Sequence, residues 1–140
     1  MRYVLLTVRY LSLIPLAWAA GLGTYLGVYT LTLGGPIGRG DLIAVAYWSL
    51  LVLGVCVPVV YLPCLFALRR LLGGWRPIVA FPLTAAALGV VPVVLIVLLW
   101  GSLRGLLSQE ALLFYCLFAA AGIVVGWVVT WGAAFEEAKL

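Results

Sequence analysis

The stretch that decides the fold is ALLFYCLFAAAGIVVGWVVTWGAAF, which occupies residues 111–135. No charged side chain interrupts it. Because a helix rises about 1.5 Å per residue, roughly 20 apolar residues cross the hydrocarbon core of a bilayer, and this stretch is long enough to do so. Backbone hydrogen bonds cannot be left open in lipid, and the alternating pattern of a barrel strand is missing. The stretch therefore predicts a transmembrane α-helix.

Three more apolar segments of similar length precede this one in the chain. They occupy residues 3–33, 42–68 and 77–103. The loops between the segments are short, so consecutive helices are expected to run antiparallel as neighbours. The predicted fold is therefore all-α: a polytopic membrane protein with one domain over residues 1–140, in which four transmembrane helices form two antiparallel hairpins.

Residues that are typical of helix ends lie in these loops. Gly34 is suited to cap the C-terminus of the first helix, and Pro36 prevents its continuation. Asp41 is expected to cap the second helix and Ser108 the fourth, with Glu110 in the first turn of the fourth helix. These residues agree with the boundaries that hydropathy predicts.

The composition excludes a soluble domain. Hydrophobic residues make up 67% of the chain and charged residues 9%, with a mean hydropathy of +1.30. Soluble domains are roughly 45–50% apolar and about 25% charged. A signal peptide is the alternative for the first segment, since Ala17-Trp18-Ala19 is an acceptable cleavage site. The apolar run continues to Leu33, longer than a signal peptide requires, so a retained helix is expected.

Basic residues are divided unevenly between the two predicted sides of the membrane. One side has Arg2, Arg9, Arg69, Arg70, Arg76 and Lys139, and the other side has Arg39 and Arg104. By the positive-inside rule, both termini are expected to be cytoplasmic, in a multi-pass protein of the inner or plasma membrane.

The basic cluster of the middle loop is expected to contact membrane lipids. Arg69, Arg70 and Arg76 would attract anionic headgroups, at about 1 kcal/mol for each residue near the surface. The net charge of +4 comes almost wholly from arginines near segment ends. This distribution is typical of membrane topology, so nucleic acid is not an expected partner.

Side chains that carry out catalysis or bind cofactors are scarce. The chain has no His, and Cys56, Cys64 and Cys116 form no C-x-x-C pair. Ser and Thr occur, but no His and no buried acid is available to activate them as nucleophiles. The sequence therefore predicts no enzymatic activity, no metal and no cofactor.

Small residues spaced four apart form two ladders, one on the first helix and one on the fourth. The ladders consist of Ala19, Gly23 and Gly27, and of Gly122, Gly126, Thr130 and Ala134. This spacing places each ladder on one helix face, where a second backbone can approach closely. Two interpretations stay open: packing within the bundle, and an interface with a second copy or another membrane protein.

Asp41 and Glu110 lie at the ends of the spans predicted to be non-cytoplasmic, and no acidic residue lies near a segment centre. Proton-coupled exchange through a carboxylate in the membrane is therefore disfavoured. Arg39 with Asp41, and Arg104 with Glu110, are expected to form exposed ion pairs worth roughly 0–1 kcal/mol each. The alternative is that these groups form a rim facing a ligand.

Prolines and tryptophans inside the spans are expected to serve packing. Pro58 and Pro63 lie close together in the second segment and should bend it to fit its neighbours. Trp18, Trp48 and Trp127 lie away from the segment ends, and burial of their large area favours a place in the bundle core over stacking on a lipid or quinone ring.

The expected function is non-catalytic. The chain would be a small integral subunit or assembly component that packs against a membrane-protein partner, or against itself, through its helix faces. The alternative is a small transporter or flippase of an apolar or lipid-like substrate, possibly a homodimer. A cavity between the helices would favour transport, whereas a solid bundle would favour the subunit.

Overall fold

The computed structural model describes the backbone of residues 2–72 and 79–137, and the side chains of residues 11–72 and 79–132. Every regular element of this part of the chain is helical. The long helices are α1 (Arg2–Leu33), α2 (Arg39–Cys56), α3 (Leu62–Leu72), α4 (Ala80–Trp100) and α5 (Gln109–Glu137). Four stretches are long and apolar enough to cross a membrane: Leu11–Leu33, Arg39–Leu72, Ala80–Trp100 and Gln109–Gly132. This confirms the prediction of four helical stretches that are long and apolar enough to cross a membrane.

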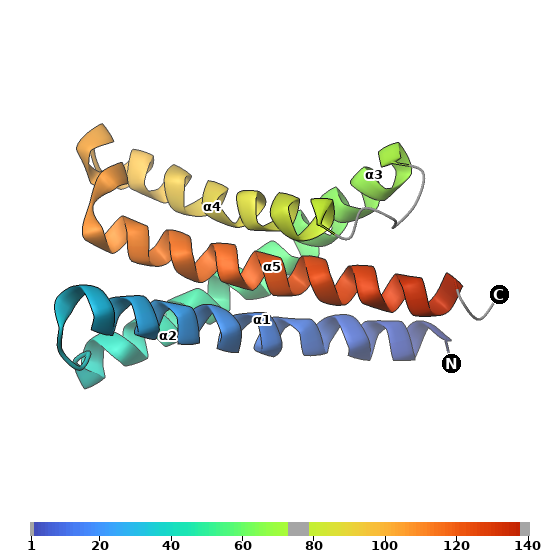
Figure 1. The fold of residues 1–140 in the computed structure, drawn as a ribbon, viewed down its shortest axis with the longest axis horizontal. Helices are drawn as coiled ribbons and strands as arrows, with labels where there is room; N and C mark the ends of the chain where they lie inside the picture. Colours follow the sequence, from blue (N-terminus) through green and yellow to red (C-terminus); the bar gives the residue numbers. More distant parts are fainter. Residues whose placement is uncertain (1, 73–78, 138–140) are drawn as a thin grey trace.

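The bundle is built around α5. Figure 1 shows α5 lying between α1 and α4, while the span made of α2 and α3 crosses behind them on a diagonal. This span contacts α1 through α2, and it contacts α4 through α3. The start of α1 and the end of α5 lie at one end of the bundle, and residues 34–38 and 101–108 lie at the other, which we call the loop end (Figure 1).

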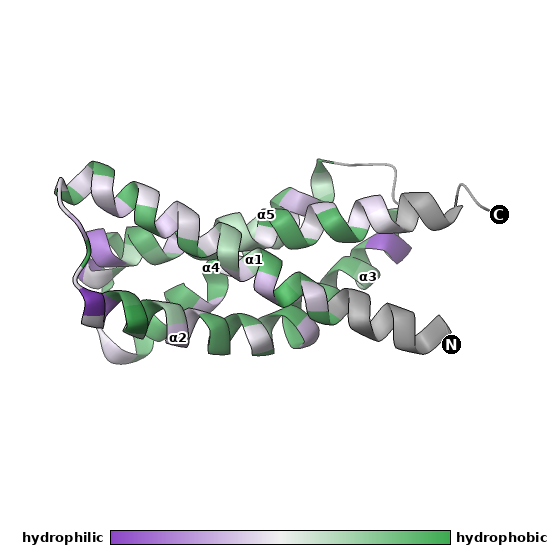
Figure 2. Cartoon of the chain, turned by 90° about the horizontal axis from the view of Figure 1, so that it is seen from below, coloured by the Kyte–Doolittle hydropathy of each residue, from purple (hydrophilic) through white to green (hydrophobic). Residues whose placement is uncertain are grey.

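The colouring of Figure 2 separates the ends of the bundle from its middle. The strongest hydrophilic colour lies at the loop end and at the end of α3, and hydrophobic residues dominate between them. Asp41 is in the first turn of α2, and Arg69 and Arg70 are in the last turn of α3. This distribution is the one that a bilayer core between two aqueous sides requires.

Two of the predicted helix ends have the expected local structure. Gly34 adopts a left-handed backbone with φ of 68°, and its N–H donates to the Thr30 carbonyl at 3.1 Å. At the start of α5, the Ala111 N–H donates to Ser108 Oγ at 3.2 Å. The predicted caps at Gly34 and Ser108 are therefore confirmed.

Two other boundaries differ from the prediction. Helix α2 begins at Arg39 with Gly38 as its N-cap, so Asp41 lies in the first turn and is not the capping residue. Helix α4 ends at Trp100, before the predicted residue 103, because Gly101 has an extended backbone (φ −127°, ψ −159°). The following residues form a short 3-10 helix, η2 (Leu103–Leu107).

The second span contains a π-helical turn, η1 (Val57–Tyr61), between α2 and α3. Pro58 within this turn has no N–H to donate, and the Leu62 N–H donates to the Val57 carbonyl five residues earlier. The predicted departure from a regular helix at the prolines therefore takes the form of a π turn. The span then continues to Leu72, beyond the predicted end at residue 68.

The core lies along α5, and two of the large aromatic side chains expected in it are elsewhere. Fully buried residues from three spans, including Tyr61, Phe81 and Leu117, meet there. Trp48 is 63% exposed and Trp127 is 55% exposed, so the prediction that they fill the core is wrong. Lipid tails are as apolar as a bundle core, so a tryptophan gains little from burial between helices.

Candidate functional site

The small-residue ladder of α5 packs against α4 within the chain. Gly122 and Gly126 are buried, and a Cβ on Gly122 would overlap the backbone of Ala85. A Cβ on Gly126 would lie 2.6 Å from Pro82 Cα. Thr130 is buried in the same region, and its hydroxyl donates to the Gly126 carbonyl at 2.6 Å. Ala134 lies in α5 outside the residues whose side chains are described.

The ladder of α1 has the opposite environment. Ala19, Gly23 and Gly27 are exposed, and a Cβ built on either glycine would meet no atom within 4 Å. The face of α1 that meets α5 is instead formed by Ala17 and Gly21, and a Cβ on Gly21 would lie 2.7 Å from the Leu117 carbonyl oxygen. Ala17 and Gly21 are also spaced four apart, so spacing alone could not distinguish the two faces.

The close approach of α4 to α5 involves a glycine that the sequence analysis missed. A Cβ on Gly89 would overlap the Phe118 carbonyl and lie 2.6 Å from the Tyr61 hydroxyl oxygen. Gly89 follows Ala85 by four residues, which is the same small-residue signal as in α1 and α5. The basic cluster is described in part: Arg69 is half-buried, Arg70 is exposed, and Arg76 lies outside the described residues.

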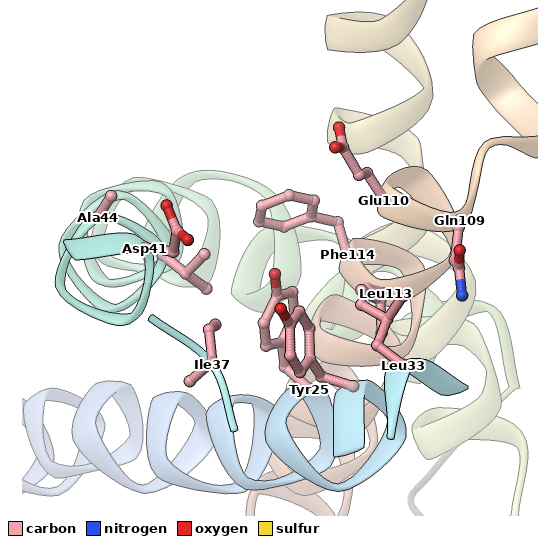
Figure 3. A pocket seen from close by; sticks show the side chains of 11 residues that line it. Tyr25, Leu33, Ile37, Asp41, Ala44, Gln109, Glu110, Leu113 and Phe114 are labelled. Atoms are coloured by element: carbon pink, nitrogen blue, oxygen red, sulfur yellow. The ribbon is translucent and has the colours of Figure 1, made fainter. Parts of the chain in front are cut away.

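A cavity of about 410 Å³ lies at the loop end between α1, α2 and α5; we call it the acidic cavity. Its lining includes Tyr25, Tyr29, Asp41, Val45, Glu110 and Phe114. Figure 3 shows Asp41 on α2 and Glu110 on α5 at facing sides of the cavity, with the Tyr25 and Phe114 rings between them. Both carboxylates are in the first turn of a helix, next to the positive end of its dipole.

Aromatic contacts hold Tyr25 in place at the bottom of the acidic cavity. Its ring stacks on Tyr29, with centroids 6.2 Å apart, and is tilted against Phe114, with centroids 5.5 Å apart. Only 6% of Tyr25 is exposed, and its hydroxyl has no hydrogen-bond partner among the described residues. The side chain is therefore fixed by its ring, and its hydroxyl is available to a ligand in the cavity.

A second cavity of about 630 Å³ lies at the same end between α2, α4 and α5; we call it the apolar cavity. Its lining includes Trp48, Val52, Val97, Trp100, Glu110, Phe114 and Phe118. Glu110 and Phe114 line both cavities, so the two adjoin along these side chains. Two adjoining cavities of different polarity thus lie between α2 and the other three spans at the loop end.

The path of the second span explains why the cavities lie at the loop end. Helix α2 runs against α1, whereas contacts of the second span with α4 and α5 are made by η1 and α3. Trp18, about halfway along α1, ties α2 to α1: its indole N–H donates to the Ala46 carbonyl at 3.0 Å and to Ser49 Oγ at 3.1 Å. The diagonal course therefore leaves space between α2 and the pair formed by α4 and α5.

The expected ion pairs at the loop end are absent from the described residues. No nitrogen of Arg39 or Arg104 lies within 4.0 Å of an oxygen of Asp41 or Glu110. That expectation is therefore wrong: both carboxylates line a cavity without a basic partner. Arg39 and Asp41 are two residues apart in the first turn of α2, and residues at this spacing do not face each other on a helix. Arg104 lies on η2, whereas Glu110 lies in the first turn of α5.

No protein-family model, curated protein or solved structure matches this chain. The described residues contain no group of three or more His, Cys, Asp or Glu side chains that could hold a metal ion. What the geometry defines is a helical protein with four spans apolar enough to cross a membrane and two adjoining cavities at one end. A site of this kind can hold a molecule with a polar end and an apolar end.

Proposed function

We propose that this chain is a small multi-pass membrane protein that binds a lipid-like or amphiphilic molecule and moves it across or within the bilayer. The observation that carries the proposal is the pair of adjoining cavities, of about 410 and 630 Å³. Ligand sites are typically clefts of roughly 300–1,000 Å³. The volumes favour this function over a solid bundle that serves only as a subunit.

The proposed ligand lies with its polar end at the membrane surface. In the proposed topology both termini are cytoplasmic and the chain resides in the inner or plasma membrane. The reason is that most basic residues, at positions 2, 9, 69, 70, 76 and 139, lie on the same side of the membrane as the termini in this topology. The cavities then open near the non-cytoplasmic surface. An amphiphile of the outer leaflet would enter with its headgroup beside Asp41 and Glu110.

Quenching of tryptophan fluorescence tests binding directly, because Trp48 and Trp100 line the apolar cavity. The full chain is reconstituted in phosphatidylcholine vesicles, and bromododecyl maltoside is added at increasing mole fraction. We expect a saturable component of quenching that disappears in the variant W48F/W100F. The matched control is W127F/W131F, since Trp127 and Trp131 are 55% and 58% exposed but do not line the cavity.

The control separates the cavity from the surrounding lipid. Quenchers dissolved in the bilayer reach all exposed tryptophans in proportion to their concentration, without saturation. If both double variants retain the same quenching curve, the cavity binds no amphiphile and the proposal is wrong. Filling the cavity with Val97→Phe should abolish the saturable component, whereas Val91→Phe, on the exposed face of α4, should preserve it.

A second function, as an accessory subunit, is favoured by one observation on α1. Ala19, Gly23 and Gly27 form an exposed face without side chains large enough to prevent close helix contact. Under this proposal a partner helix, or α1 of another copy, packs on that face. Gly23→Leu with Gly27→Leu should then remove co-purifying chains in native mass spectrometry while the fold is kept; unchanged stoichiometry would exclude the face as an interface.

A further inference from the structure

We infer that the acidic cavity selects an organic cation, so that the ligand is an amphiphilic amine or quaternary ammonium compound with its apolar chain in the apolar cavity. This inference rests on the proposed function and names its substrate class. It is carried by the juxtaposition of two carboxylates without basic partners, a buried tyrosine whose hydroxyl lacks a partner, and a second apolar space beside them.

The charged residues that line the acidic cavity indicate the sign of the ligand's charge. Asp41 and Glu110 line the acidic cavity, and no Lys or Arg is among its lining residues. Arg39 and Arg104 belong to the same end of the bundle but form no ion pair with either carboxylate. An anionic headgroup would be repelled by both acids, whereas a cation between them would be attracted by both.

The aromatic residues indicate an organic cation and not a metal ion. Tyr25, Tyr29 and Phe114 line this cavity with their rings in contact with one another, and aromatic rings attract ammonium groups. A calcium ion needs roughly six to eight oxygen ligands, and the described residues offer no cluster of three acidic, His or Cys side chains. The Tyr25 hydroxyl, which has no partner, can accept a hydrogen bond from a protonated amine.

The position of Glu110, which lines both cavities, indicates that the ligand has an apolar end as well as a cationic end. Glu110 and Phe114 line both cavities, so a headgroup held at Glu110 lies where the apolar cavity begins. An alkyl or aromatic group attached to that head can then lie among Trp48, Val52 and Trp100. A small hydrophilic cation would leave this larger cavity unfilled, and therefore an apolar chain is part of the ligand.

Three probes that share one apolar chain test the inference on the full-length protein in phosphatidylcholine vesicles. They are bromododecyl trimethylammonium, bromododecyl maltoside and bromododecyl sulfate, compared by saturable tryptophan quenching. We expect the cation to bind about tenfold more tightly than the neutral probe, and the anion to bind most weakly. The net charge of +4 predicts the opposite order for general surface attraction, so the order is diagnostic.

Charge-neutralising variants test whether Asp41 and Glu110 cause the preference for the cationic probe. Asp41→Asn and Glu110→Gln keep side-chain size, and each should reduce cation affinity about tenfold while affinity for the maltoside stays within about twofold. Glu137→Gln, at the opposite end of α5, removes an equal charge and should change nothing. Retained affinity for the maltoside also shows that the variants are folded.

The outcomes separate this inference from the proposed function. If all three probes quench saturably with equal affinity, or if the double variant D41N/E110Q keeps the preference for the cation, the cation site is wrong and the amphiphile-binding function stands. If no probe quenches saturably, the proposed function and the cation site are both wrong.

Discussion

Gly122 and Gly23 belong to the two ladders that the sequence predicts on equal grounds, but their surroundings differ. A Cβ on Gly122 would overlap the Ala85 backbone, whereas a Cβ on Gly23 would meet no atom within 4 Å. Helix association in lipid depends on such close approach, because there is no hydrophobic driving force between helices. The same residue type thus holds α5 to α4 at one position and leaves an open face at the other.

This difference gives a prediction for a matched pair of substitutions. Gly122→Leu should destabilise the bundle by about 3 kcal/mol or more, because a backbone cannot move aside as a side chain can. Gly23→Leu should leave the free energy of unfolding unchanged or raise it by up to about 1 kcal/mol, because the added side chain meets no atom and glycine is a poor helix former. Unfolding by sodium dodecyl sulfate, followed by helical circular dichroism, measures both. Equal stabilities of the two variants would show that α4 and α5 do not pack through Gly122.

Gly34 and Gly35, at the C-terminal end of α1, offer a second matched pair of substitutions. Gly34 ends α1 with a positive φ of 68°, and Gly35 does not share this conformation. Neither position has an atom within 4 Å of a built Cβ, so the two differ in backbone conformation and not in space. Gly34→Ala should cost about 1 kcal/mol of stability, since a side chain disfavours the left-handed region.

Gly35→Ala serves as the control for that substitution. It should leave stability unchanged or raise it slightly, because alanine restricts the unfolded chain. Both variants are measured in the same detergent titration as the wild type. A loss for Gly35→Ala as large as that for Gly34→Ala would contradict the assigned helix end.

At the element scale, local features were predictable from the sequence and long-range features were not. The caps at Gly34 and Ser108 follow from short-range chemistry, as do the four spans from hydropathy. Ladder spacing predicted close contact but not which face would make it, since Ala17 and Gly21 match the pattern as well as Ala19 and Gly23 do. The choice of face depends on where α5 lies, which no local pattern contains.

The cavities could not be predicted for the same reason, and they depend on the whole molecule. Asp41 and Glu110 are about half the chain apart in sequence, and they line one cavity because α2 and α5 both begin at the loop end. The sequence placed both acids at one end of the bundle, with a ligand-facing rim as one of two options. In the structure both acids line the cavity that lies beside α2, where the second span contacts α1 and not yet α4.

The topology of the whole molecule gives the last prediction. Replacing Cys56, Cys64 and Cys116 by Ala allows single cysteines to be introduced and labelled in intact cells with a maleimide that cannot cross membranes. If the termini are cytoplasmic, Gly35→Cys and Ser102→Cys should be labelled from outside, because Gly35 lies between α1 and α2 and Ser102 lies between α4 and η2, in the two connections that form the loop end. Arg70→Cys, in the last turn of α3 at the other end, should be labelled only after permeabilisation. The reverse pattern would place the cavities on the cytoplasmic surface, where the ligand would then have to enter from the inner leaflet.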